Sequence, residues 1–282
     1  MADISGSDAS DAEAPVATVT SNEKGTPAET GKRNAFTELM SSKTKQPKQT
    51  EPTKQNKSQK LGSKFKIRDG LGVYIERPET FSSSVVIYFN DDFVAINDLY
   101  PKSSLHLLLL PRDPSKFFQH PFDAFEDHRF LQKVRAEAKK LRTLAAGELR
   151  RRYGKYSSQE TARREAMEQD PPADDLPPGR DWEKELMVGI HAAPSMNHLH
   201  IHVLSVDRYS DRLKHRKHYN SFATPFFVDI DDFPLAQDDP RRHPGHYLKR
   251  DFICWRCSRN FGNRFQELKD HLEEEYEQWK KL

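Results

Sequence analysis

The sequence is poor in cysteine, in long apolar runs and, over its first sixty residues, in large apolar side chains. Its only two cysteines, Cys254 and Cys257, are too few to cross-link 282 residues and too closely spaced for an ordinary structural disulfide. No stretch approaches the roughly 20 apolar residues of a membrane span, and the N-terminus has no apolar core of the signal-peptide kind. We therefore expect a soluble, intracellular protein of a reducing compartment, with no membrane partner.

Residues 1–60 are rich in Ser, Thr, Lys, Glu and Ala, and such a composition buries too little apolar surface to offset the entropy of ordering. This predicts a disordered tail. Residues 1–30 carry six acids and one base, whereas residues 31–70 carry eleven bases and three acids. A basic arm of this kind suits contact with a phosphate backbone or nuclear import, although a merely solvating tail has the same composition. Phe36, Leu39 and Met40 lie at i, i+3 and i+4, which predicts a short helix near 34–41.

The rest of the chain has the patterning of an α+β protein. Short runs rich in β-branched or apolar residues predict strands at 73–75, 85–89, 93–96, 105–111 and 185–191. Apolar residues recur among charges over about 122–152 and predict a helix there. The proline-containing segment 155–181 is expected to be a polar insertion or loop. We expect one domain over 65–230, a linker over 231–250 and a second domain over 251–282.

The densest chemistry lies in the run from His198 to Leu204, where three histidines alternate with apolar residues. Side chains alternate across a strand, so His198, His200 and His202 should share one face. Imidazoles with a reference pKa of about 6.5 suit nucleophilic attack and proton transfer near neutral pH. A metal site and a structural cluster are the alternatives, but no acid or cysteine lies beside the run in sequence to complete a metal site.

The run His-φ-His-φ-His-φ-φ, with φ apolar, resembles the signature of the histidine-triad (HIT) family of nucleotide hydrolases and transferases. The resemblance implies an antiparallel sheet with helices. It also implies that the middle histidine, His200, attacks the α-phosphate of a nucleoside monophosphate unit without a catalytic metal, and that water then frees it. Further expected contacts with the nucleotide or phosphate follow by position: His198, His202, Ser195, Met196, Asp98 on the ribose, the active-site histidine His106, and Lys102.

The two cysteines belong to a second motif. Cys254-x2-Cys257 is followed after thirteen residues by His271 and after three more by Glu275. Two thiolates on a turn, with two ligands one helical turn apart, suit tetrahedral zinc, and a carboxylate is an acceptable fourth ligand. We therefore expect a small ββα-like zinc finger. The alternative is that the cysteines are incidental and that Glu275 belongs to a solvated acidic run.

A triad domain followed by a Cys2HisGlu finger is similar to fungal members of a DNA-repair branch of the HIT family. This resemblance implies removal of AMP from 5′-adenylated DNA ends left by abortive ligation, in the nucleus and by a monomer, with structural zinc. It places DNA contacts at Lys102, Lys214, Lys217 and His218. Phe36 is the candidate for stacking on exposed bases, although simple helix packing would explain it equally. The rival functions are hydrolysis of small nucleotides or adenosine phosphoramidates, and non-catalytic binding of DNA breaks.

Overall fold

The computed structural model describes residues 67–171 and 174–282, which belong to one compact unit, Phe65–Leu282. The predicted tail of residues 1–60, with its helix near 34–41 and Phe36, lies outside the described residues. The expected division into 65–230, 231–250 and 251–282 stays a prediction. None of the described helices is long and apolar enough to cross a membrane.

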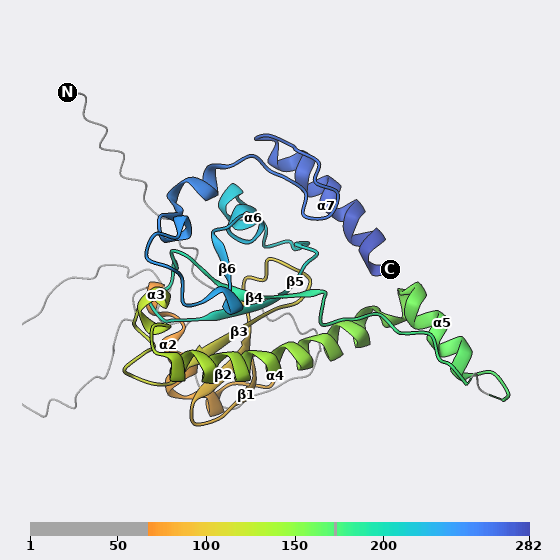
Figure 1. The fold of residues 1–282 in the computed structure, drawn as a ribbon, viewed down its shortest axis with the longest axis horizontal. Helices are drawn as coiled ribbons and strands as arrows, with labels where there is room; N and C mark the ends of the chain where they lie inside the picture. Colours follow the sequence, from red (N-terminus) through yellow and green to blue (C-terminus); the bar gives the residue numbers. More distant parts are fainter. Residues whose placement is uncertain (1–66, 172–173) are drawn as a thin grey trace, which may run out of the picture. The chain divides into compact units, whose positions relative to one another are not determined.

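A six-stranded antiparallel sheet in the order β1-β2-β3-β5-β4-β6 forms the centre of the described chain (Figure 1). Its strands are β1 (Val86–Phe89), β2 (Phe93–Asn97), β3 (His106–Pro111), β4 (Leu186–His191), β5 (Ile201–Ser205) and β6 (Phe227–Asp229). The strands β3 and β5 lie side by side in the middle, with His106 opposite Leu204 and Leu108 opposite His202. The antiparallel α+β architecture expected from the sequence is confirmed.

Helices surround this sheet. They are α2 (Gly72–Glu76), α3 (Pro121–Ala124), α4 (His128–Tyr153), α5 (Ser158–Met167), α6 (Arg216–Ala223) and α7 (Phe265–Lys280). Short 3-10 turns occupy Ile67–Asp69, Pro78–Thr80, Gly154–Tyr156, Ile230–Asp232, Pro240–Arg242 and Pro244–Lys249. The long helix α4 runs along the sheet (Figure 1).

The two sheet faces bury different clusters, as the alternation of side chains requires. Leu199, Ile201 and Val203 pack into the main core together with α4, whereas Leu108 and Leu110 pack with α2 on the opposite face. The alternation predicted for residues 198–203 is thereby confirmed for its apolar half. The histidines of β3 and β5 consequently face away from α4.

Three expectations about secondary structure are wrong. Residues 73–75 lie in helix α2 rather than in a strand, because Tyr74 and Ile75 cover the sheet as part of its second core cluster. The helix expected over 122–152 is divided, since Asp127 caps a new helix by accepting hydrogen bonds from the backbone of Arg129 and Phe130. The expectation of a polar insertion or loop over 155–181 missed the helix α5, whose start is capped by Ser157.

The C-terminal segment, residues 251–282, packs against the sheet domain. An antiparallel bridge between Ile253 and Asn260 precedes α7, as a ββα-like finger requires. Phe252, Phe261 and Leu268 share one buried cluster with Tyr219 of α6. At the far end of α7, Trp279 is fully buried in the main core.

One arginine fastens that far end. The guanidinium of Arg180 lies between the rings of Trp182 and Trp279, with its carbon 4.3 and 4.8 Å from their centroids. Its Nη1 donates to the carbonyl oxygen of Trp279 at 2.7 Å, and its Nη2 lies 3.1 Å from Glu185. Because the buried charge is paired and stacked, α7 is held in one position on the sheet domain.

Candidate functional site

Five histidines meet on the sheet face opposite α4; we call them the histidine cluster. His106 begins β3, His191 ends β4 and His202 lies within β5, while His198 and His200 precede β5 directly. The ring of His202 lies between three of the others, with centroids 5.1 Å from His106, 4.5 Å from His191 and 4.9 Å from His200. The structure thus brings His200, His202 and His106 together, and their catalytic roles stay predictions.

A main-chain amide sets the tautomer of two of these rings. The backbone N–H of Lys102 donates to Nδ1 of His106 at 3.1 Å, so the neutral His106 ring carries its proton on Nε2. That Nε2 lies 2.9 Å from Nδ1 of His202, which must then accept. The proton of His202 is therefore on Nε2, and this buried atom has no hydrogen-bond partner among the described residues.

The middle histidine has the opposite tautomer. Nδ1 of His200 lies 2.7 Å from the carbonyl oxygen of His198, and a carbonyl only accepts, so Nδ1 carries the proton. The lone pair of His200 is thus on Nε2. A neutral imidazole that is oriented through one nitrogen and unprotonated at the other is a competent nucleophile.

Burial keeps these rings neutral. Loss of solvation lowers the pKa of His106 to about 4, and the neighbouring Asp98 carboxylate opposes that shift only in part. The same desolvation lowers the pKa of His200, and it lowers the pKa of His202 and His191 well below the usual range. The tautomers deduced above therefore describe the cluster at neutral pH.

Asp98 lies just after β2, beside the cluster. Its Oδ1 accepts from the backbone of Tyr100 at 2.8 Å, and its Oδ2 lies 3.3 Å from Nδ1 of His106. The Asp98 carboxylate thus lies next to His106, the ring that links the Lys102 amide to His202 by hydrogen bonds. Its expected contact with ribose hydroxyls stays a prediction.

The loop between β4 and β5 carries Ser195 and Met196. Ser195 is exposed, and its carbonyl oxygen accepts from Nε of Arg68 at 2.8 Å. The next residue but one, Asn197, donates through its backbone to the carbonyl of Arg68 at 2.9 Å. Met196 is half-buried against the cluster that contains α2. The loop is thereby tied to the beginning of the described chain.

Two phenylalanines flank the first triad histidine. The ring of His198 lies 5.6 Å from that of Phe117 and 4.6 Å from that of Phe118, centroid to centroid. His198 is buried, its Nδ1 has no partner in the described part of the chain, and desolvation lowers its pKa. Phe118 is 61% exposed, so an apolar surface lies open beside the histidine cluster.

No role for His191, or for the aromatic side chains packed behind it, is predicted from the sequence. His191 contacts Phe222 of α6 and Phe226 at centroid distances of 4.5 and 5.3 Å. Its place is set by the register of β4 on β5, where Gly189 stands opposite His202. A single sequence indicates strands but not their register. The only sequence feature that could have pointed to His191 is its position at the end of an apolar strand.

The residues expected to contact DNA lie beside this site. Lys214 and Lys217 are exposed, and the half-buried His218 accepts at Nδ1 from the backbone of Lys214 at 3.2 Å. Burial, followed by the charge of Lys102, lowers the pKa of His218 to about 4. The charge of Lys102 also lowers the pKa of His106 and His202, and its ammonium group donates to the carbonyl oxygen of Tyr100 at 2.6 Å.

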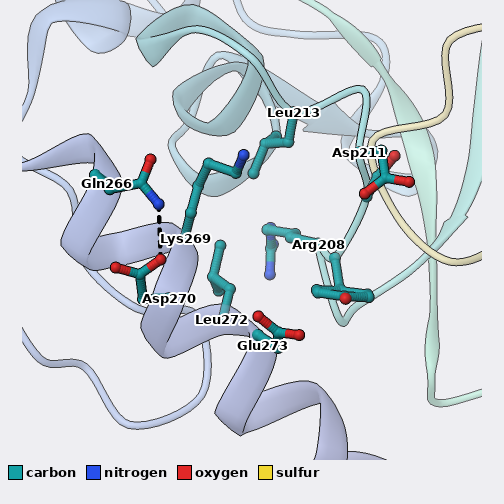
Figure 2. A pocket seen from close by; sticks show the side chains of 10 residues that line it. Arg208, Asp211, Leu213, Gln266, Lys269, Asp270, Leu272 and Glu273 are labelled. Atoms are coloured by element: carbon teal, nitrogen blue, oxygen red, sulfur yellow. Dashed lines mark hydrogen bonds between the residues drawn. The ribbon is translucent and has the colours of Figure 1, made fainter.

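A separate hollow of about 150 Å³ lies between the 208–213 loop and α7 (Figure 2). Gln266, Lys269, Asp270 and Glu273 face it from the helix, and Arg208 lies between the two walls (Figure 2). It is a polar groove of mixed charge, lined by the loop and the helix rather than by the histidine cluster.

The four residues of the finger motif come together as predicted. One ligand atom from each of Cys254, Cys257, His271 and Glu275 lies within 4.8 Å of all the others. Both cysteines are free thiols, and Cys257 Sγ lies 3.1 Å from Nε2 of His271. Two sulfurs, one imidazole nitrogen and one carboxylate oxygen form a donor set that suits tetrahedral zinc.

Comparison with known proteins agrees with this architecture. Residues 79–209 match the HIT domain, and residues 223–278 match the C2HE / C2H2 / C2HC zinc-binding finger. The aprataxin-like protein of Schizosaccharomyces pombe is 38% identical over 216 residues, which are 77% of this chain and 84% of that protein. The aprataxin-like protein of Saccharomyces cerevisiae is 36% identical over 218 residues, 74% of this chain and 95% of that protein.

Solved structures show the same likeness. A crystal structure of the aprataxin orthologue Hnt3 in complex with DNA has a TM-score of 0.60 and 35% identity, and the match covers 76% of this chain and 96% of Hnt3. A crystal structure of the aprataxin orthologue Hnt3 from Schizosaccharomyces pombe has a TM-score of 0.60 and 37% identity, and the match covers 77% of this chain and 97% of Hnt3. Since both halves of the chain match together, the protein belongs to the aprataxin family of HIT-domain DNA-repair hydrolases.

Proposed function

We propose that the protein removes AMP from 5′-adenylated DNA ends through a covalent intermediate on His200. The observation that supports this most directly is the pair of complementary tautomers. His200 presents a lone pair on Nε2, while His202 presents a buried N–H that lacks a partner among the described residues. One ring can attack a phosphorus atom and its neighbour can donate to a phosphate oxygen.

The reaction has two steps. Nε2 of His200 attacks the phosphorus of the AMP unit, the bond from that phosphorus to the bridging anhydride oxygen breaks, and the DNA leaves with a 5′-phosphate. Water then attacks the same phosphorus, the bond to Nε2 breaks, and AMP is released. The DNA end is again a substrate for ligation.

The other residues bind and orient the substrate in this proposal. The Nε2–H of His202 donates to a non-bridging phosphate oxygen, with His198 on the other side of His200. Asp98 and Met196 bind the nucleoside part, and the Ser195 hydroxyl contacts the leaving group. Their positions around the histidine cluster support these roles.

Lys102, Lys214, Lys217 and His218 bind the DNA backbone. Lys102 lies on the loop before β3, Lys214 just before α6, and Lys217 and His218 in the first turn of α6, whose Phe222 contacts the histidine cluster. Contacts to phosphates supply affinity and salt dependence without reading sequence, as a nick-directed enzyme needs. Phe36 is retained as the proposed stacking residue, and the enzyme acts in the nucleus as a monomer.

Zinc held by Cys254, Cys257, His271 and Glu275 has a structural role here. A closed site with four protein ligands leaves no position for substrate, so the ion stabilises the finger and takes no part in the reaction. The ligand positions in the middle of α7 and in the turn at 254–257 support that reading.

The decisive experiment uses nicked DNA with a radiolabelled 5′-AMP. Wild type should release labelled AMP, and a quench during the reaction should trap label on the protein. His200→Ala should do neither. His128→Ala is the matched control, because His128 is exposed at the start of α4. Equal AMP release by wild type and His200→Ala would refute the mechanism, and equal turnover of adenosine phosphoramidate with salt-insensitive DNA binding would favour a small-nucleotide hydrolase.

A further inference from the structure

The carboxylate of Glu275 is shared between two neighbours. Its Oε1 lies 3.2 Å from Nε2 of His271, on the side of the other candidate zinc ligands. Its Oε2 accepts from Nη1 of Arg256 at 2.6 Å. Only 11% of the Glu275 side-chain surface and 30% of that of Arg256 are exposed, so the contact is partly sheltered from water. One oxygen is thus directed to the site and the other is occupied.

Arg256 comes from the turn between the two cysteines. Its backbone N–H points to Sγ of Cys254 at 3.5 Å, while its side chain crosses to Glu275 on α7. The backbone contact would survive any substitution that keeps the turn. The guanidinium contact depends on the side chain alone, so a mutation can remove it selectively.

The charges show why this contact matters. Zn²⁺ with two thiolates and one neutral imidazole is formally neutral, and a second imidazole would leave it so. A glutamate as the fourth ligand makes the site formally −1. The guanidinium of Arg256 returns the local balance to zero and occupies the carboxylate oxygen that would otherwise compete for the ion.

We infer that Arg256 is the positioning residue that allows Glu275 to act as the fourth zinc ligand. Zinc binding by Glu275 therefore depends on the contact with Arg256. This inference rests on the proposed zinc site. It assigns to Arg256 a role that a finger with histidine at position 275 would not need. Ordinary exposed ion pairs change an equilibrium by less than roughly fivefold, whereas removal of a partner that orients a metal ligand costs about 10- to 100-fold in metal affinity.

The test is a double-mutant cycle on the full chain, read out as zinc affinity in competition with a chromogenic chelator. Arg256→Gln should weaken zinc binding by roughly 10- to 100-fold. Glu275→His should still bind zinc, and adding Arg256→Gln to it should change the affinity by less than about threefold. Arg259→Gln is the matched control, because Arg259 lies in the same turn with its guanidinium over the ring of Phe261; it should stay within about twofold of wild type.

A second readout is the visible spectrum of the Co²⁺-substituted protein. It should change between wild type and Arg256→Gln, and it should be insensitive to that mutation in the Glu275→His background. An unchanged zinc affinity in Arg256→Gln, or an equal loss in both backgrounds, would overturn the inference. If wild type held no zinc, the proposed metal site itself would fail instead. Should Arg256→Gln be insoluble, the Arg256→Gln, Glu275→His double mutant must be soluble and bind zinc, or the inference is wrong.

Discussion

Nε2 of His106 and Nδ1 of His202 are 2.9 Å apart, and the only proton between them belongs to His106, whose Nδ1 accepts from the backbone of Lys102. A main-chain amide therefore determines which nitrogen of the last triad histidine can donate. Unlike a side chain, that amide cannot change its protonation state.

Replacing His106 tests this control of the tautomer. His106→Asn should lower the single-turnover rate of AMP transfer by roughly 10²-fold, because His202 would then be free to place its proton on the wrong nitrogen. The KM should change much less, since His106 is buried and its ring contacts the Lys102 amide and His202. Stopped reactions on adenylated nicked DNA measure both values. A wild-type rate in His106→Asn, with His128→Asn as control, would contradict the idea.

Acid should destabilise the protein before it titrates the carboxylates. The unfolded chain binds a proton at His106 below pH 6.5, whereas the folded chain does so only near its lowered pKa of about 4. Folding stability is therefore complete above pH 6.5 and is lost as the pH falls toward 4, by about 3 kcal/mol from His106 alone. Urea unfolding at pH 7.5, 6.0 and 5.0 measures this. His106→Phe should make the profile shallower, and a wild-type profile that is already flat would show that the ring is not held neutral.

Gly189 should not tolerate a side chain. A Cβ atom there would lie 2.3 Å from the carbonyl oxygen of Val228 and 2.7 Å from the ring of Phe227. Gly189→Ala should cost about 1–3 kcal/mol and disturb the aromatic wall behind His202. The matched control is Gly147→Ala in α4, where nothing lies within 4 Å of a new Cβ; it should stabilise the protein by about 0.5–1 kcal/mol. Thermal unfolding compares the two, and equal effects would contradict the prediction.

Zinc removal should weaken the whole described unit and not the finger alone. Tyr219 joins the finger core to α6, and Trp279 places the end of α7 in the main core. A chelator should lower the unfolding temperature by roughly 5–10 °C, equivalent to about 2–3 kcal/mol, in a single transition. Calorimetry with and without added zinc measures this, and Cys254→Ser should mimic the chelator. Two separate transitions, with the upper one unchanged, would show that the finger melts independently.

The sequence was informative where the evidence was local. The alternation of residues 198–203 and the Cys-x2-Cys spacing each depend on a single strand or turn. The apolar half of the alternation is buried as predicted, and the four residues of the finger motif come together. The roles given to individual site residues stay predictions. The α5 helix was also visible in principle, because Ser157 is followed three residues later by Glu160, whose backbone N–H donates to the serine hydroxyl. The neighbouring prolines concealed that signal.

What the sequence could not give depends on contacts between distant segments. His191 reaches the histidine cluster only through the register of β4 on β5, and Arg256 meets Glu275 only when the finger closes. In the same way, Val73, Tyr74 and Ile75 have the composition of a strand, but they fold as a helix whose Tyr74 and Ile75 cover one face of the sheet.

The short helix α6 contacts both the finger core and the histidine cluster. Tyr219 packs into the finger core and hydrogen-bonds the carbonyl of Ile253 at 2.8 Å, while Phe222, one turn later, lies 5.1 Å from the ring of His202. Loss of packing in the finger would therefore displace the ring of Phe222 beside His202. A chain whose metal site is damaged should therefore lose catalytic activity as well as affinity for DNA.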